Sequence, residues 1–594
     1  MRPLKALRIS PLILGITLSL AAVCGLSAQD LRRPPTPADR QQFGSTGWPA
    51  ARDQLQTALL AAYAPGGSQR PGSTGVTAFK SWLLLWKWAD LLSKPEQPFG
   101  TKPQESASPS ADMRTNADIL DPAVVRAWIA DEAFGTMLFA TLSPDDNATQ
   151  VLKNLQEIYQ ANAAKFREYQ ALALALAVVY DEPLPRYWPH HQVTQSLIPI
   201  TNQTVAERFA YWTGVNDGKD LLLDIRRLKA DQLKFLVDAP IDPAEFAWAR
   251  KRVRLSRSEM PKAFSMIRYD RDRLMNQQYS WTEGPYKLDE ISSKGGICVD
   301  QAYFACMVGK ARGLPTLYFS GQGVDGGHAW FGYMKLDDKW ELDCGRYENQ
   351  NYATGEALDP QTWTPISDHE LQFLAKRFRD TPLYAASQDD ILFAELFLAS
   401  GQNDRALRAA DSAVSVCPEN PDAWNEKIAV LEKTQASLPV RRTNLEAASK
   451  QFTNYRDLRV DYQLALAKVA REQGDAATAD ALERQAQYQN KNKRSDLSVS
   501  IAAGRLSTLV EQKQFDEAFK EYKKQITSLG KTGGGNFFYD IVEPFAMALK
   551  GAGDTARAES AVSLARKALR PETGGILDVD MTQLENAVSA KAGN

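Results

Sequence analysis

The sequence predicts a multidomain, mainly α-helical protein with one α+β segment near its middle and an α-solenoid after it. At 594 residues the chain is too long for one hydrophobic core. Helical periodicity dominates residues 29–284, strand-like patterns appear between 285 and 385, and helices with a repeated spacing return at 386–570. We therefore expect a helical domain with Pro/Gly/Ser-rich linkers, an α+β core, a solenoid and a tail at 571–594.

The first 28 residues are predicted to be a signal peptide. Three basic residues precede an apolar stretch at 11–22, and Ser27-Ala28 supplies small residues before a cleavage site. This pattern indicates an exported bacterial protein, periplasmic or extracellular, with no integral membrane span after signal removal. Acylation of Cys24, giving a lipid-anchored protein, is the alternative, and an uncleaved anchor is a third possibility.

The helical region at 29–284 gives no functional signature of its own. It begins with a polar, Pro-rich leader expected at 29–45, and helices are expected from 49–63 onward, including single helices at 123–142 and 164–180. His190-His191 follows a Pro-rich turn; such a pair can bind a metal, but a surface loop is the expected role. The net charge of −2, from 70 Lys+Arg and 72 Asp+Glu, argues against nucleic acid or an anionic membrane as partner.

Cys298 stands at the predicted start of a helix in the α+β core. Gly295-Gly296 precedes it, an apolar run follows, and Gly313 and Pro315 end the helix. A helix N-terminus carries free N–H groups and partial positive charge, which favour the thiolate over the thiol. The glycines allow another part of the backbone to approach the sulfur closely. Cys298 is therefore a candidate nucleophile.

His328 and Asp343 lie on the two strands of a predicted hairpin. His328 opens a strand-like run that ends at Leu336, residues 337–338 read as a turn, and the returning strand ends near Asp343. The parity of the two positions allows both side chains on one face of the hairpin. A plain two-residue turn places Asp343 opposite Gly332, so a bulge or another register is needed to bring it to His328.

These motifs together resemble the transglutaminase-like superfamily, and most closely its bacterial, papain-like cysteine hydrolases. The resemblance covers 289–360: Gly-Ile-Cys-x-Asp-x-Ala, Gly-Leu-Pro, Gly-His-Ala-Trp and Trp-x-x-Asp. It implies that Cys298 is the nucleophile, His328 the base and Asp343 the third member of a catalytic triad. Cys344-Gly345-Arg346 departs from the family pattern, in which many members continue with a proline after the aspartate. Arg346 is expected in a local salt bridge rather than on a substrate carboxylate.

The oxyanion donors and the other cysteines are less well determined. The backbone N–H of Cys298 is one expected donor; Gln278, Tyr279 or Trp281 could offer another, although core or turn roles are expected for them. Disulfides among three further cysteines are possible in an oxidising compartment, and a zinc site with Cys298 and His328 lacks the usual ligand spacing. We expect no metal or cofactor. The three cysteines are Cys306, Cys344 and Cys417.

The region from 386 to 570 matches the spacing of tetratricopeptide repeats. Small residues recur where two helices of such a repeat cross closely, as at Ala406 and Ala413, Ala479 and Ala486, and Ala558 and Ala565. Such a solenoid offers a concave face on which a protein partner can bind. A purely structural stack is the alternative.

The sequence thus predicts an exported cysteine-dependent acyl-transfer enzyme, a peptidase or amidase acting on protein or peptide amides. The same triad would serve a protein-glutamine transglutaminase, and the absence of a recognisable calcium loop favours hydrolysis. A non-catalytic envelope scaffold that binds proteins is the alternative from another class. Nothing in the sequence identifies the substrate.

Overall fold

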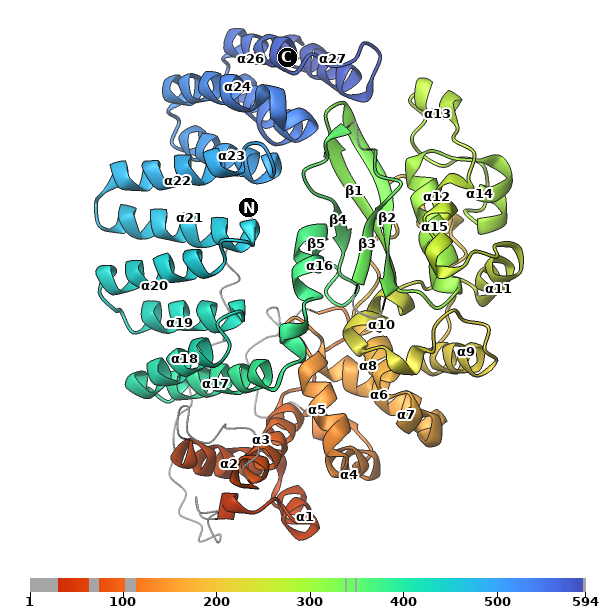
Figure 1. Ribbon diagram of the computed structural model, residues 1–594, viewed down its shortest axis with the longest axis vertical. Coiled ribbons are helices and arrows are strands. Elements are labelled where there is room, and N and C mark those ends of the chain that lie inside the picture. Colours follow the sequence, from red (N-terminus) through yellow and green to blue (C-terminus); the bar gives the residue numbers. More distant parts are fainter. Residues whose placement is uncertain (1–29, 64–73, 102–113, 337–338, 348–349, 591–594) are drawn as a thin grey trace.

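The computed structural model describes residues 30–63, 74–101, 114–336, 339–347 and 350–590. It is mainly helical (66% helix) around a five-stranded antiparallel sheet (Figure 1). The predicted signal peptide with Cys24 and the predicted turn at 337–338 lie outside these residues. Within them, no helix has both the length and the apolar character needed to cross a bilayer.

Before α15 and the sheet, the described residues form the α-helices α1 to α14 (Figure 1). The most apolar of them, α8, has buried residues at every position from Leu172 to Val179, as expected for a helix that is hydrophobic all round. The bounds are α1 Pro37–Thr46, α2 Trp48–Ala62, α3 Thr74–Ser93, α4 Pro122–Ala130, α5 Glu132–Thr141, α6 Ala148–Ala161, α7 Ala163–Glu168, α8 Gln170–Val179, α9 Val205–Asp217, α10 Ala230–Val237, α11 Pro243–Arg252, α12 Lys262–Ser265, α13 Arg271–Met275 and α14 Leu288–Lys294.

The sheet has the strand order β3-β2-β1-β4-β5, and α15 (Cys298–Ala311) packs against β1 and β2. The β1–β2 hairpin turns tightly between Gly323 and Gly326, which are paired. Almost every side chain of α15 is buried, since it lies between the sheet and the helices that precede it. The strands are β1 Thr316–Gly323, β2 Gly326–Leu336, β3 Lys339–Cys344, β4 Glu356–Leu358 and β5 Pro365–Ser367.

After the sheet, the chain forms α16 and then a series of helices that we call the helical arch, α17 to α27. Successive arch helices contact one another, as Figure 1 shows along one side of the sheet. The arch begins against α2 and ends against the β1–β2 hairpin, which α24 and α27 contact. The bounds are α16 Asp368–Leu374, α17 Pro382–Ala399, α18 Asn403–Val416, α19 Pro421–Lys433, α20 Leu438–Gln451, α21 Arg456–Glu472, α22 Ala476–Asn490, α23 Ser495–Glu511, α24 Phe515–Phe537, α25 Glu543–Gly551, α26 Thr555–Leu569 and α27 Ile576–Ser589, with a π-helical turn at Phe538–Val542.

Three segments differ from the expectation. Within the predicted leader, α1 is fixed by a capping box between Thr36 and Asp39 with proline at its first turn. The helices expected at 123–142 and 164–180 are each divided, because Asp131 and Tyr169 take non-helical conformations. The predicted tail contains α27, whose apolar residues at spacings of four, three and four are all buried: Leu577, Met581, Leu584 and Val588.

Candidate active site

The position of Cys298 at the first turn of α15 agrees with the sequence prediction. Two glycines bring the chain there. Gly295 has φ +88°, and a Cβ on it would lie 2.6 Å from the carbonyl oxygen of Arg268; a Cβ on Gly296 would lie 2.4 Å from the Cβ atom of Asp300. The helix start is closed by the Asp300 carboxylate, which accepts the N–H of Ile297 at 2.8 Å.

The environment of the thiol differs from the expected one. Burial raises the pKa of Cys298 to about 11, and the nearby charge of Asp300 adds to this. The N–H groups of Ala329, Val299 and Cys298 itself act in the opposite direction, but they do not outweigh desolvation. At neutral pH the sulfur is therefore protonated, and a base must remove its proton before it can attack.

His328 lies on β2 with one ring nitrogen already engaged. Its Nε2 is 2.8 Å from the carbonyl oxygen of Gly345. A carbonyl only accepts hydrogen bonds, so Nε2 carries the proton of the neutral ring and Nδ1 keeps its lone pair. Burial lowers the pKa of His328 to about 4, and the imidazole is neutral at physiological pH. The ring stacks on Tyr347 with centroids 4.0 Å apart.

Cys298 and His328 belong to one site. The N–H that approaches the Cys298 sulfur is that of Ala329, the residue next to His328. Tyr347 and Tyr352 stack on the His328 ring. Both tyrosines line the same cavity as Cys298 and His328, and the pKa of each is raised, first by burial and then by the negative charge of a Cys298 thiolate. The structure therefore brings together the predicted nucleophile and the predicted base.

Asp343 does not contact His328 in the structure. A bulge is present in the β2–β3 pairing, but it places both Leu342 and Asp343 opposite Gly332. A plain two-residue turn would give Asp343 the same position, opposite Gly332. Gly332 lies four residues along β2 from His328. The Asp343 side chain is 58% exposed and pairs with Arg346 at 2.7 Å. The prediction made Asp343 the hydrogen-bond acceptor for His328, whereas in the structure the Gly345 carbonyl has that role.

The turn that presents the Gly345 carbonyl requires glycine. Gly345 has φ +94°, and a Cβ there would lie 2.6 Å from the ring of Phe264.

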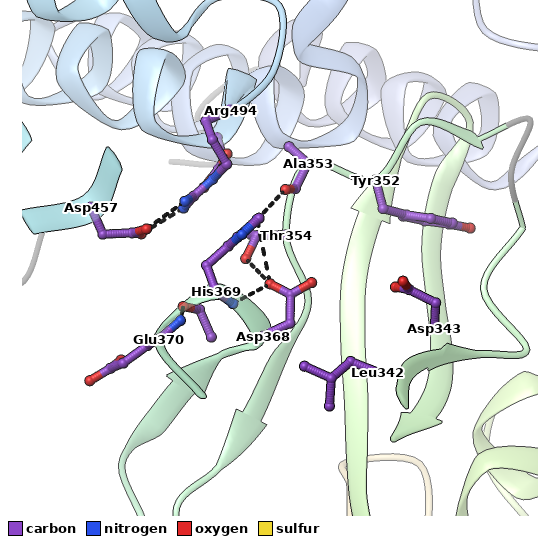
Figure 2. A network of polar contacts seen from close by, with 12 residues as sticks. Leu342, Asp343, Tyr352, Ala353, Thr354, Asp368, His369, Glu370, Asp457 and Arg494 are labelled. Carbon is purple, nitrogen blue, oxygen red and sulfur yellow. Dashed lines mark hydrogen bonds and ion pairs between the residues drawn. The ribbon is translucent and has the colours of Figure 1, made fainter. Parts of the chain in front are cut away.

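Arg346 fixes the same turn by donating to Asp343, to Asp368 at 3.1 Å and to the carbonyl oxygen of Tyr352. Arg346 thus forms the local salt bridge expected of it. Figure 2 shows Asp368 bound in turn to Thr354 and to the backbone of His369, with Asp343 nearby.

A buried polar chain lies behind Cys298, and sequence reasoning missed it. The Asp300 carboxylate, with a fully buried side chain, pairs with Arg273 at 2.7 Å and accepts the hydroxyl of Tyr286 at 2.9 Å. That hydroxyl is 2.9 Å from Nε2 of His190, whose Nδ1 accepts the N–H of Gln192. His190 is consequently a buried residue with both nitrogens occupied, not a surface-loop residue, and burial lowers its pKa to about 3.

Two of the residues considered as upstream oxyanion donors can be placed, and Trp281 has the turn role expected of it. The Trp281 indole donates to the carbonyl oxygen of Gly284 at 2.9 Å, as a turn-closing residue does, whereas Tyr279 lines the cavity described below. The N–H groups that surround the sulfur come from the helix start and from β2, at Cys298, Val299 and Ala329. The Ala329 amide follows directly after the histidine motif, which is the signal that could have identified it.

One cavity of about 2430 Å³ contains the site. The core and the arch both line it, from Cys298 and His328 on one wall to Asn425 in α19 and Asp580 in α27 on the other. All four histidines of the chain line it as well. Substrates larger than a typical small molecule fit such a space, because small-ligand sites are roughly 300–1,000 Å³.

The structure holds the cysteines Cys298, Cys306, Cys344 and Cys417 as free thiols, of which only Cys298 is not buried. Among the residues that the structure describes, no group of three His, Cys, Asp or Glu side chains is placed to bind a metal ion. Burial raises the pKa of Cys306 and of Cys344 to about 12 in each case. Cys298 is therefore the described thiol that a substrate can reach.

No protein-family model matches the chain, and no curated protein matches it.

Proposed function

We propose that the protein is an exported cysteine-dependent acyl-transfer enzyme, most similar to a transglutaminase-like peptidase or amidase, acting on protein or peptide amides. The observation that carries this proposal is the joint position of Cys298 and His328 in one cavity, with the amide of Ala329 beside the sulfur. We further propose that the arch is a tetratricopeptide-like solenoid, whose small residues at the helix crossings include the buried Ala406 and Ala413.

The first chemical step transfers one proton and forms one bond. The Cys298 sulfur attacks the amide carbon while its proton passes to Nδ1 of His328, the nitrogen that the Gly345 contact leaves unprotonated. The charge that develops on the substrate oxygen is stabilised by backbone N–H groups at the start of α15. Because thiol and imidazole are both neutral beforehand, the proton moves during attack and not before it.

The later steps return the enzyme to its starting state. The tetrahedral intermediate collapses, the C–N bond breaks, and the departing amine takes the proton from His328. Water then attacks the acyl-enzyme, gives its proton to His328, and the thiol leaves as the carboxylic acid product forms. In the alternative, a protein-glutamine transglutaminase, a primary amine takes the place of water with the same residues.

Trapping the acyl-enzyme tests the proposal. The protein is mixed with a library of peptides, with and without a primary amine, and its intact mass and the products are followed by mass spectrometry. A mass increase at Cys298 with free carboxylic acid products supports the peptidase, and amine-linked products support the transglutaminase. No adduct on Cys298 and no product with any peptide would contradict both.

A non-catalytic envelope scaffold is a second candidate, and two observations favour it. Burial raises the pKa of the Cys298 thiol to about 11, and Asp343 pairs with Arg346 instead of His328. Such a site would bind protein without turning it over. Peptide that binds with no acyl adduct and no product is the outcome that selects this candidate.

A further inference from the structure

The core and the arch close on each other at the β1–β2 hairpin. The N–H of Glu572, in the loop before α27, donates to Asp325 at 3.2 Å. The kink of α24 brings Gly534 against β1, where a Cβ would lie 2.7 Å from the carbonyl oxygen of Gly323. A Cβ on Gly326 would lie 2.9 Å from Ile576 of α27. The arch contacts the hairpin at this end and α2 at its other end. The core and the arch form the two walls of the active-site cavity.

The cavity is elongated along the arch. Its lining passes from Pro421 and Asn425 of α19 through residues of α21 and α23 to Val579 and Asp580 of α27. The opposite wall includes Cys298, His328 and the strands β4 and β5. A site that runs along so many successive elements suits an extended chain that contacts both walls.

The lining carries far more negative than positive charge. Ten carboxylate side chains line the cavity, against four from lysine or arginine. One of the four, Arg494, is already paired with two of the ten carboxylates: it binds Asp457 at 2.5 Å (Figure 2) and Asp496 at 2.7 Å. The positive charges therefore do not balance the carboxylates of this wall.

The excess is clearest at the end of the cavity near the hairpin. Asp325, Glu356, Asp540, Glu572 and Asp580 all line it there. The pKa of Asp540 is raised by burial first and then by the negative charges of Glu356 and Asp496, so these carboxylates repel one another when the cavity holds no cation. A positively charged ligand would relieve that repulsion, whereas a phosphate backbone would increase it.

We propose that the cavity binds an extended, positively charged polypeptide segment, whose lysine or arginine side chains meet the carboxylates of the arch while one of its amides reaches Cys298. The inference rests on the proposed function for the reaction and adds the substrate class. Binding itself depends on the cavity walls alone and can be measured without turnover.

Binding to the full chain carrying Cys298→Ala separates the two proposals. Fluorescence anisotropy is measured with two labelled peptides of equal length, one rich in lysine and one with glutamate at the same positions. At low salt we expect the lysine peptide to bind at least about tenfold more tightly, and the difference to shrink as salt is raised. Equal affinity, or a preference for the glutamate peptide, would overturn the substrate class while leaving the chemistry at Cys298 untested by this assay.

Charge variants locate the effect. In the same background, Glu356→Gln with Asp540→Asn is expected to weaken binding of the lysine peptide about fivefold. The matched pair Glu517→Gln with Glu559→Gln removes two exposed carboxylates that do not line the cavity, and should change affinity less than about 1.5-fold. An equal effect of both pairs would attribute the preference to net charge and overturn the cavity assignment.

Discussion

The two walls of the cavity hold their functional groups in different ways. On the core wall, Asp300, Tyr286 and His190 are buried and joined by direct hydrogen bonds, and Cys298 and His328 are desolvated beside them. On the arch wall, carboxylates such as Asp540 and Asp580 line a space that opens to solvent. On the core wall, the fixed positions of individual side chains determine the chemistry. On the arch wall, the total charge of the carboxylates determines which ligands bind. Substitutions should therefore have large, salt-independent effects on the first wall and small, salt-dependent effects on the second.

The largest expected effect is on stability, at Asp300. The side chain of Arg273 is only 7% exposed, and Asp300→Asn leaves its guanidinium buried without a counter-charge. We expect a loss of roughly 3–5 kcal/mol in the free energy of unfolding, measured by urea denaturation. Asp289→Asn, an exposed carboxylate of α14, should change it by less than about 0.5 kcal/mol. Similar losses for the two variants would contradict the contrast between buried and solvated carboxylates.

The second effect distinguishes Gly345 from Asp343. Gly345→Ala forces a side chain into a positive φ and against Phe264, which displaces the carbonyl that holds His328. We expect kcat/KM to fall about 100-fold, because displacement of a catalytic group by about 1 Å has that effect. Asp343→Asn, which alters only an exposed ion pair, should stay within about threefold of wild type. Reversed ranks would restore Asp343 as the third member of the triad.

The pH dependence of kcat/KM follows from the two neutral groups. His328 accepts a proton only when it is unprotonated, so activity should be lost as pH falls through its pKa of about 4. The thiol pKa of about 11 places the loss on the alkaline side somewhat farther from neutrality than the acidic loss. A plateau from about pH 6 to about pH 9 is expected. An acidic limb near pH 6.5, the ordinary value for histidine, would show that His328 is not desolvated.

The smallest effect belongs to the arch wall. Raising the salt concentration from about 0.05 M to about 0.5 M shortens the Debye length and should lower kcat/KM for a lysine-rich peptide about fivefold. Alkylation of Cys298 by iodoacetamide, an uncharged reagent, should change in rate by less than about 1.5-fold over the same range. If the alkylation rate depends on salt concentration as steeply as kcat/KM does, then the charges of the cavity also act on Cys298 at the core wall.

Sequence reasoning located the parts of the site that side chains define. Gly295-Gly296 and the apolar run after Cys298 predicted the start of α15. The predicted triad required a bulge or another register to bring Asp343 to His328, and the bulge that forms leaves Asp343 opposite Gly332. The acceptor for His328 could not be predicted, because a backbone carbonyl depends on the fold of a turn and not on the identity of a side chain. The departure of Cys344-Gly345-Arg346 from the motif that the sequence otherwise resembles was the indication at that point.

Other features of the structure could not be predicted because they depend on contacts between distant parts of the chain. His190 joins Tyr286 and Asp300 across about a hundred residues, and a single sequence contains no signal for that contact. The helix α27, in contrast, was predictable, since Leu577 and Met581 begin a regular apolar spacing. Its position on the β1–β2 hairpin depends on the whole course of the arch, which local patterns do not determine.

Turnover by two cysteine variants tests the central claim most directly. Cys298→Ala and Cys306→Ala are compared with wild type on the same peptide amides, and circular dichroism confirms that each is folded. Cys306 is a buried thiol of the same helix and therefore the matched control. We expect Cys298→Ala to abolish turnover and Cys306→Ala to retain most of it; undiminished turnover by Cys298→Ala would show that Cys298 is not the nucleophile.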